Sequence, residues 1–415
     1  MASWFEGARF GMFVHWGHVS QRGWELSWPL VGGLSVFPCC QDVPASTYHE
    51  SARTFCPRPQ SARDWLARAR RAGMRYAVLT TKHHDGFAMF PTRAADFSIA
   101  ATPYRGDLVG EFVEATRDAG LRVGLYFSLS DWHHADYPPF TDADRPYRMG
   151  LAPRPTSEQW ERFLGVLFAQ VRELLTRYGP IDVLWFDGGW ERSVEEWRTP
   201  ALHDLIRSLA PDVLVNDRLP GFGDFDTPEQ FIPPQPPARP WETCMTMNDS
   251  WGYNPSDRSY KSPRELVHAL CEVAGRGGNL LLNVSPTGDG QLPPEQIERL
   301  ETIAAWMGAH AASIHDTQAG LAPWQFYGPS TRRGDRIYLH LLQRPYDTVT
   351  VRGMPIRHVR AVRELRTGSA LAFRTRCAVA DQLFNADPNG ELIISVPETL
   401  IDPLATVLEV ELAAP

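Results

Sequence analysis

Short apolar runs alternate with amphipathic segments along the first three quarters of the chain. The apolar runs, which predict strands, span residues 9–16, 75–81, 121–129, 181–187, 212–218, 242–247 and 279–284. The amphipathic segments predict helices at residues 61–73, 107–120, 156–179, 193–211, 262–278 and 293–310. Because the apolar runs are almost continuously hydrophobic, we expect strands that are buried on both faces.

Strands that alternate with helices predict a parallel sheet in an α/β protein, with helices on both of its faces. Seven or eight such units over about 310 residues fit a (β/α)8 barrel. A doubly wound sheet is less well supported, since no glycine-rich phosphate loop follows the first strand. An eighth strand is not evident, and residues 220–240 form a proline-rich loop in place of a helix. We therefore predict an irregular, TIM-like barrel.

The pattern changes after about residue 314. Short runs, some of them alternating between polar and apolar positions, lie at residues 335–343, 348–353, 357–367, 371–375 and 391–397. Such runs, separated by Gly, Pro, Asp and Asn, predict a small antiparallel β-sandwich. The chain is thus predicted to contain a catalytic barrel at residues 1–318 and a C-terminal β-sandwich domain at residues 319–415.

Composition narrows the range of partners. The chain is 43% hydrophobic and 22% charged, with a net charge of −8, which argues against nucleic acid or an anionic membrane surface as the main partner. No run approaches the ~20 apolar residues of a membrane span. The N-terminus shows no secretory signal and the six cysteines show no metal-binding spacing, so we expect a cytoplasmic protein with reduced thiols. A homo-oligomer is possible.

Polar side chains gather where the predicted strands end. His15 ends the first strand, and His83 and His84 end the second. Tyr126 lies on the third strand, and Asp187 ends the fourth. The fifth ends at Arg218, and Glu242 lies on the sixth. In a (β/α)8 barrel the ends of all strands open toward one mouth, so these residues predict an active site there.

A pair of carboxyl groups is the chemistry that this pattern favours. Asp187 follows a buried hydrophobic strand, and two glycines after it leave room for a ligand. As a nucleophile in glycoside hydrolysis it would need a second carboxyl group as general acid and base. Glu242 is the first candidate, because apolar surroundings raise the pKa of a carboxyl group. Glu25, Asp131 and Glu50 compete with it.

The three histidines allow two interpretations. A neutral imidazole has one donor and one acceptor, which suits the hydroxyl groups of a sugar. Zinc binding by histidines with Asp187 is the alternative. Against it, the sequence has no His-x-His or His-Glu-x-x-His motif. The side chains of His83 and His84 also point to opposite faces on a regular strand.

At these residues the chain resembles the α-L-fucosidases of glycoside hydrolase family 29. The matching stretches are WFEGARFGMFVHWG, KHHDGF, GLYFSLSDW, LWFDGGW, PWETCMTMNDSWGYN and GNLLLNVSPTGDG. They follow the order of that family and extend from Trp4 to about residue 310. The resemblance implies an irregular (β/α)8 barrel, a β-sandwich-like domain and exo-acting hydrolysis of α-L-fucosides with retention.

The resemblance also implies roles for individual residues. Asp187 is similar to the nucleophile and Glu242 to the acid/base. The residues that correspond to binders of fucose are His15, Glu25, His83, His84, Tyr126 and Arg218. Trp251 is a candidate for the apolar surface that the methyl group of a 6-deoxy sugar needs. The segment after Glu25 departs from the usual Trp-Tyr pair of the family.

No metal and no organic cofactor is expected, because two carboxyl groups supply both the nucleophile and the proton. The expected partner is a small fucosylated saccharide. Two alternatives stay open at this point. One is a fucose-binding, lectin-like protein with weak or no catalysis, and the other is a metal-dependent hydrolase on the same barrel.

Overall fold

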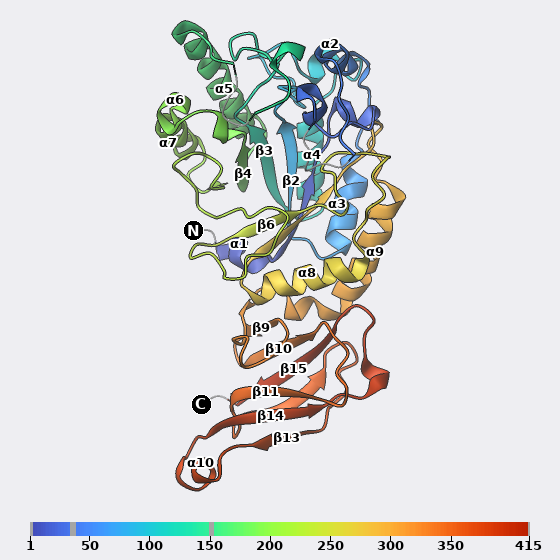
Figure 1. Cartoon of the computed structure of the whole chain (residues 1–415), viewed down its shortest axis with the longest axis vertical. Helices are drawn as coiled ribbons and strands as arrows, with labels where there is room; N and C mark the ends of the chain where they lie inside the picture. The colour runs from blue at the N-terminus through green and yellow to red at the C-terminus, as the bar shows by residue number, and fades with distance from the viewer. Residues whose placement is uncertain (1–2, 34–38, 149–152, 414–415) are drawn as a thin grey trace.

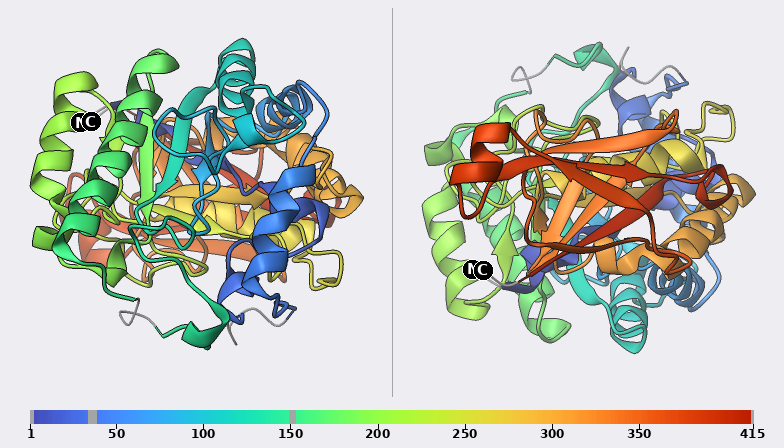
Figure 2. Two further views of the ribbon diagram at one scale, coloured as in Figure 1. Left: turned by 90° about the horizontal axis from the view of Figure 1, so that it is seen from above. Right: turned by 90° about the horizontal axis from the view of Figure 1, so that it is seen from below.

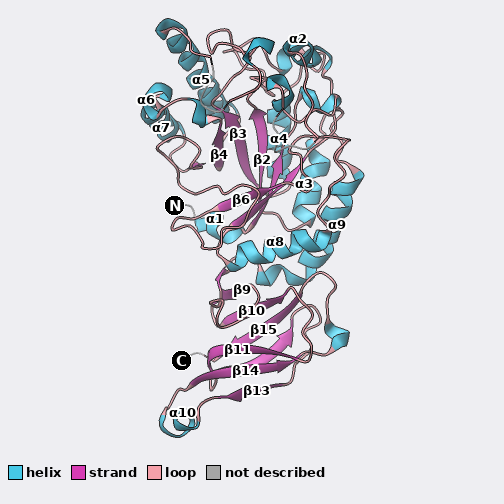
Figure 3. Cartoon of the chain, in the orientation of Figure 1, coloured by secondary structure: helices cyan, strands magenta, loops and turns pink. Residues whose placement is uncertain are grey.

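The computed structural model describes residues 3–33, 39–148 and 153–413. Helices surround a sheet in the larger, N-terminal part, and the C-terminal part consists almost entirely of strands (Figure 3). The two parts are stacked along the long axis of the molecule, with α8 and α9 between the larger sheet and the C-terminal strands (Figure 1). This arrangement is the predicted barrel followed by a small antiparallel domain.

Seven parallel strands form the barrel sheet, in the order β5-β4-β3-β2-β1-β7-β6. They are β1 (Phe10–Val14), β2 (Tyr76–Lys82), β3 (Arg122–Ser128), β4 (Val183–Asp187), β5 (Leu214–Val215), β6 (Glu242–Met245) and β7 (Asn279–Val284). Nearly every residue in them is buried. Continuous burial explains why these strands are readable as uninterrupted apolar runs.

An irregular segment at residues 224–230 occupies the eighth position between β5 and β6. On one side, the backbone N–H of Asp217 donates to the carbonyl of Phe225 over 3.0 Å. On the other side, the N–H of Glu242 donates to Asp226 and the N–H of Gln230 donates to Cys244, both over 2.9 Å. The segment lies in the proline-rich loop that the sequence analysis left without an element. The predicted irregular barrel is confirmed, and the missing strand is this broken one.

Helices cover the outside of the barrel, as the view from above shows (Figure 2). They are α1 (Ser3–Ala8), α2 (Ala45–Glu50), α3 (Ala62–Arg71), α4 (Leu108–Asp118), α5 (Ser157–Arg177), α6 (Val194–Trp197), α7 (Thr199–Leu209), α8 (Pro263–Gly275) and α9 (Pro294–His310). Capping boxes at Thr156 and Ser262 begin α5 and α8. The single helix predicted at residues 193–211 is two, because Arg198 adopts a left-handed conformation between α6 and α7.

Two antiparallel sheets form the C-terminal part, in the orders β12-β15-β10-β9-β8 and β11-β14-β13. Their strands are β8 (Gln318–Ala319), β9 (Ser330–Arg333), β10 (Arg336–Leu341), β11 (Thr348–Pro355), β12 (Val359–Glu364), β13 (Phe373–Arg376), β14 (Asn389–Ser395) and β15 (Thr406–Leu412). A short helix, α10 (Val379–Phe384), joins β13 to β14. The boundary predicted between residues 318 and 319 falls within β8 and stays a prediction.

Hydrogen bonds join this domain to the underside of the barrel. The indole N–H of Trp306, in α9, donates to the carbonyl of Ala405 over 2.9 Å. Arg264, in α8, donates to the carbonyl of Leu342 over 3.1 Å. These contacts, and the position of α8 beside the C-terminal strands in Figure 1, show that the C-terminal domain packs against the barrel through α8 and α9.

Candidate active site

A pocket of about 840 Å³ opens at the carboxyl ends of the barrel strands. It is lined by seven of the residues that the sequence pointed to: His15, His83, His84, Tyr126, Asp187, Arg218 and Trp251. They come from β3 and β4 and from the loops after β1, β2, β5 and β6. Closure of the barrel thus gathers side chains that are up to 236 positions apart in the sequence, from His15 to Trp251.

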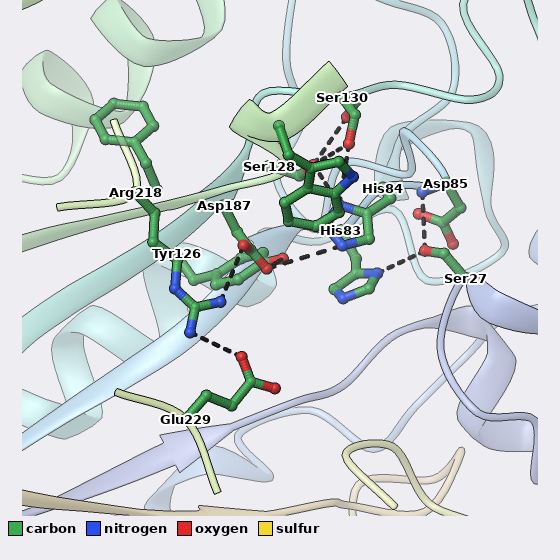
Figure 4. Close-up of polar contacts among 12 residues, drawn as sticks. Ser27, His83, His84, Asp85, Tyr126, Ser128, Ser130, Asp187, Arg218 and Glu229 are labelled. Atoms are coloured by element: carbon green, nitrogen blue, oxygen red, sulfur yellow. Dashed lines mark hydrogen bonds and ion pairs between the residues drawn. The ribbon is translucent and has the colours of Figure 1, made fainter. Parts of the chain in front are cut away.

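Asp187 is the last residue of β4, and its side chain points into the pocket (Figure 4). Its Oδ2 accepts a hydrogen bond from the Tyr126 hydroxyl over 3.0 Å, and its Oδ1 lies 3.1 Å from Nη1 of Arg218. The residue is 8% exposed. Gly188 follows with a φ of 71°, where a Cβ would come within 2.4 Å of Ser130 Oγ, so the turn behind the carboxylate needs glycine.

Arg218 joins two carboxylates in the pocket. Its Nη1 contacts Asp187, and its Nη2 donates to Oε2 of Glu229 over 2.7 Å. The guanidinium also lies over the ring of Trp185, with its central carbon 4.6 Å from the ring centre. Burial acts to lower the pKa of Arg218, but the neighbouring carboxylates, Asp187 first, raise it above its ordinary value. Arg218 is therefore a fixed positive charge between two acidic groups.

Glu229 is the pocket carboxylate that sequence reasoning missed. It lines the pocket, and 37% of its side chain is exposed. It belongs to the broken strand at residues 224–230, where a parallel bridge pairs it with Cys244 of β6. The sequence analysis treated residues 220–240 as a proline-rich loop and so passed over this residue. The available signal was a single glutamate in a segment that links two barrel strands.

Glu242 was predicted to be the acid/base, and this prediction is wrong. It is the first residue of β6, in register with the first residue of β7, and therefore lies at the opposite end of the barrel from the mouth. It is 0% exposed, and its carboxyl group accepts hydrogen bonds from the Tyr76 hydroxyl and, over 3.1 Å, from the Trp185 indole. Burial raises its pKa to about 7, but no substrate can reach it.

Glu25 does not line the pocket either, which corrects the expectation that it binds substrate. Its carboxyl group accepts hydrogen bonds from the backbone N–H of Trp251 over 2.7 Å and of Gly252 over 3.0 Å. Burial raises its pKa to about 8, although these two hydrogen bonds oppose the shift. Glu25 thus holds the loop that carries Trp251 against the pocket. Of the other candidates, Asp131 is buried in an ion pair with Lys82, and Glu50 lines a separate hollow.

The three histidines lie around the pocket, with His15 and His84 buried and His83 half-buried, and all three are uncharged near neutral pH. Burial is the largest cause of the lowered pKa of each, and the pKa values of His15 and His84 fall to about 3. The pKa of His83 also lies well below its ordinary value. Each ring is held from behind through Nδ1, so Nε2 is the atom that can meet a ligand.

These histidines predict that the fold weakens in acid. The unfolded chain takes up protons below about pH 6.5, whereas folded His15 and His84 do so only near pH 3. Their contribution to stability is therefore complete above pH 6.5 and is lost as the pH falls from 6.5 toward 3. The slope is about 1.4 kcal/mol per pH unit for each histidine. The slope is measured from the free energy of unfolding in urea, determined for wild type and His15→Gln between pH 7.5 and 4.5. We expect a shallower slope in the variant; parallel curves contradict the assignment.

A second buried carboxylate organises one wall of the pocket. Glu191 accepts hydrogen bonds from the indole of Trp132 over 3.0 Å, from the hydroxyl of Tyr147 over 2.7 Å and from the hydroxyl of Tyr137. The indole N–H of Trp190 donates to the Tyr147 hydroxyl over 2.7 Å. Through this chain Glu191 fixes Trp190, which lines the pocket beside Asp187.

The remaining polar groups show no metal centre. Within residues 3–33, 39–148 and 153–413, no group of three or more His, Cys, Asp or Glu side chains is arranged to hold a metal ion. Among the helices of these ranges, none combines the length and the apolar character needed to cross a bilayer. The pocket offers two carboxylates, Asp187 and Glu229, that share one guanidinium, together with neutral histidines.

Comparisons with known proteins point to one family. The family model described as Alpha-L-fucosidase matches residues 1–312. The tissue alpha-L-fucosidase of Macaca fascicularis is 29% identical, over 96% of this chain and 85% of that protein.

Solved structures agree with the family match. Alpha-L-fucosidase isoenzyme 1 from Paenibacillus thiaminolyticus superimposes with a TM-score of 0.86 and 35% identity, over 99% of this chain and 98% of that one. A family 29 alpha-L-fucosidase from Bacteroides thetaiotaomicron has a TM-score of 0.82 and 26% identity, over 99% and 95% of the two chains. That structure holds a covalent intermediate trapped with 2-fluoro-fucosyl fluoride in a Glu-to-Gln mutant.

Proposed function

Because the chain belongs to the alpha-L-fucosidase family, we propose that it hydrolyses α-L-fucosides with Asp187 as nucleophile and Glu229 as acid/base. The chain is a glycoside hydrolase of family 29, and the family works by retention. One observation carries the assignment of the two residues. Among the carboxylates of the pocket, Asp187 and Glu229 share the guanidinium of Arg218, which places them together at the mouth of the barrel.

The two groups divide the reaction into two displacements. In the first, an oxygen of Asp187 attacks the anomeric carbon, and the bond from that carbon to the leaving oxygen breaks. Glu229 gives its proton to the leaving oxygen, and a fucosyl ester of Asp187 forms. In the second, a water molecule attacks the anomeric carbon and gives a proton to Glu229, while the ester bond breaks. The two inversions give net retention.

The polar neighbours of Asp187 suit this role. Tyr126 and Arg218 each bind one of its oxygens, so the carboxylate is held in one orientation before the substrate arrives. Arg218 also binds Glu229, which keeps the second carboxyl group next to the first. Glu229 must give a proton in the first displacement and accept one in the second.

The walls of the pocket suit a 6-deoxy sugar. His15, His83 and His84 present neutral imidazoles to the hydroxyl groups of the ring. Phe13 and Trp251 add aromatic surface on the β1 side of the pocket, where a methyl group is buried favourably. These residues support fucose as the sugar held next to Asp187.

A direct experiment tests the function. Hydrolysis of p-nitrophenyl α-L-fucoside, followed by NMR, is expected to release α-L-fucose first, before the free sugar mutarotates. Release of the β-anomer first would contradict the retaining mechanism. Binding of L-fucose without any turnover would favour the lectin-like alternative. Activity that is lost in a chelator and restored by a divalent cation would favour the metal-dependent one.

Trp190 is proposed to hold the leaving group. It lines the pocket beyond Asp187, together with Val194 and Pro220, and stacking of a sugar or aryl ring on an indole contributes about 1 kcal/mol. Replacing Trp190 with alanine is therefore expected to lower kcat/KM for p-nitrophenyl α-L-fucoside about fivefold. The kcat/KM for α-L-fucosyl fluoride, whose leaving group has no ring that could stack on Trp190, should change by less than about twofold. Equal losses on both substrates would show that Trp190 acts on the sugar or the fold.

Two broader expectations remain proposals. We propose that the protein works in the cytoplasm on small fucosylated saccharides. The six cysteines are free thiols in the structure, as is usual in a reducing compartment, and a pocket of about 840 Å³ suits the terminal sugar of a short saccharide. Homo-oligomer formation is likewise a proposal.

A further inference from the structure

The three pocket histidines have different partners behind them, although each is held through Nδ1. The partner is the amide of Asn283 for His15, the hydroxyl of Ser128 for His84 and the hydroxyl of Ser27 for His83 (Figure 4 shows the last two). A neutral imidazole carries its single proton on one nitrogen only. The partner of Nδ1 therefore decides whether Nε2 donates to a ligand or accepts from it.

The amide of Asn283 fixes the tautomer of His15. Its Nδ2 donates to the carbonyl of Trp251 over 2.8 Å, so its Oδ1 is the atom that faces His15, at 2.7 Å from Nδ1. An amide oxygen only accepts, and Nδ1 of His15 must therefore carry the proton. The Nε2 of His15 then presents a lone pair to the pocket.

The contacts of His84 do not fix one tautomer. The Ser128 hydroxyl donates to the carbonyl of Ser130 over 2.9 Å and lies 2.7 Å from Nδ1 of His84. The Ser130 hydroxyl lies 3.1 Å from the same nitrogen and can donate to it. Nε2 of His84 lies 3.8 Å from Oδ2 of Asp187.

The environment of His83 reverses the direction. The backbone N–H of Asp85 donates to the Ser27 hydroxyl over 2.9 Å, and Nδ1 of His83 lies 2.6 Å from the same oxygen. Ser27 is 0% exposed, so its own hydrogen needs a protein acceptor. If Nδ1 of His83 carried a proton, two donors would point at one hydroxyl, and the hydroxyl hydrogen would lose this acceptor. The hydroxyl hydrogen would then have to turn to the Tyr48 hydroxyl, the other hydroxyl near it.

Another serine of the chain shows the contrasting case. The Ser51 hydroxyl donates to the carbonyl of Tyr48 over 2.8 Å and must therefore accept from Nδ1 of His18, its other contact. Ser27 instead accepts a hydrogen bond from the backbone N–H of Asp85. A serine behind a histidine thus sets either tautomer, depending on what else the hydroxyl touches.

We propose that Ser27 is a positioning residue that holds His83 in the tautomer protonated on Nε2. His83 then donates a hydrogen bond into the pocket, whereas His15 accepts one from a ligand. The rings of His15 and His83 lie 6.0 Å apart between centres, so a donor and an acceptor are neighbours in the pocket. Such a pair binds one hydroxyl that accepts and one that donates, and it fixes the direction of the hydrogen bonds along the sugar. This consequence for recognition rests on the proposed function.

A spectroscopic test needs no substrate. The long-range ¹H–¹⁵N correlation spectrum of protein labelled with ¹⁵N-histidine distinguishes the two tautomers, and the His83→Gln variant assigns the signals of His83. We expect protonated Nε2 in His83 and protonated Nδ1 in His15 of the ligand-free wild type. Protonated Nδ1 in His83 would overturn the proposal and would mean that the Ser27 hydrogen goes to Tyr48, the other hydroxyl near it.

Variants connect the tautomer to turnover. In Ser27→Ala the His83 signals are expected to move toward a mixture of tautomers, and kcat/KM for p-nitrophenyl α-L-fucoside should fall about fivefold. The matched control is Ser51→Ala, which removes a buried serine that contacts a histidine outside the pocket; it should leave the His83 signals unchanged. An unchanged His83 spectrum in Ser27→Ala would overturn the proposal. If the spectrum behaves as expected but no fucoside is hydrolysed, the proposed function fails and the tautomer assignment stands.

Deoxy substrates provide an independent measurement. If His83 donates to one hydroxyl of the sugar, the loss caused by Ser27→Ala should disappear for one of the 2-, 3- and 4-deoxy p-nitrophenyl fucosides and persist for the other two. An equal loss for all three would show that Ser27 acts on the fold as a whole and would overturn its role as a positioning residue.

Discussion

Replacing Asp187 with glycine is expected to lower kcat for p-nitrophenyl α-L-fucoside by at least about 10⁴-fold, the scale on which loss of a catalytic nucleophile or its partner acts. The reason is geometric. Asp187 is the carboxylate that β4 delivers to the mouth of the barrel, with one oxygen held by Tyr126 and the other by Arg218. Without it, no group on that side of the sugar can form a bond to the anomeric carbon.

Azide distinguishes the loss of a nucleophile from damage to the fold. A glycine leaves a space in which azide can attack the anomeric carbon from the face that Asp187 used. The expected product is β-L-fucosyl azide, the result of a single inversion. Asp217→Asn is the matched control, because Asp217 also lines the pocket, at the end of the neighbouring strand. It should retain most of the activity and form no azide adduct. Rescue of Asp217→Asn and not of Asp187→Gly would reverse the assignment.

Replacing Glu229 with alanine is expected to have the second largest effect. For a fucosylated disaccharide, whose leaving group needs a proton, kcat should fall by about 10²–10⁴-fold, the usual contribution of general acid–base catalysis. For an aryl fucoside with an acidic phenol the loss should be smaller, because the leaving oxygen hardly needs the proton.

Azide again gives a specific product. In Glu229→Ala the fucosyl ester of Asp187 still forms, and azide then replaces it from the opposite face, so the adduct should be α-L-fucosyl azide. The two variants are thus distinguished by the stereochemistry of one product. A β-adduct from Glu229→Ala, or no adduct at all with unchanged hydrolysis, would contradict the acid/base role.

Glu242→Gln completes this comparison, since Glu242 is the residue that the sequence favoured. Glutamine keeps the shape of the side chain and an acceptor for the hydroxyl of Tyr76 and the indole of Trp185. We expect this variant to keep most of its activity on a fucosylated disaccharide and to form no azide adduct. The opposite outcome, with Glu229 dispensable and Glu242 essential, would restore the assignment made from the sequence.

The error about Glu242 has a simple physical cause. In a parallel barrel, the first residue of a strand and the last one lie at opposite ends, about 3.3 Å apart for each residue of the strand. Glu242 begins β6, whereas Asp187 ends β4. The sequence analysis also begins the sixth strand at Glu242, but it groups this residue with those at the ends of the other strands, so both carboxylates seemed to belong to one mouth.

The failure to find Glu229 has a different cause. The segment at residues 224–230 has no apolar run and no alternation of polar and apolar residues. In the structure it pairs with the neighbouring backbone only through isolated bridges. Its position is set by its neighbours in the closed barrel and by no pattern of its own. Glu25 shows the same limit: its burial under the loop of Trp251 depends on contacts 226 positions away in the chain.

The sequence by itself determined the alternation of strands and helices, the change to a small β domain, and the strand-end residues His15, His83, His84, Tyr126 and Asp187. These features are local, because hydrophobic periodicity and strand ends can be recognised from adjacent residues. Only the tertiary structure decided which carboxylate lies near Asp187 and which nitrogen of each histidine faces the pocket. It also decided which acidic residues are buried outside the pocket and accept hydrogen bonds from the protein. Those choices depend on burial and hydrogen-bond partners that come from distant segments, and the closure of the barrel alone brings them together.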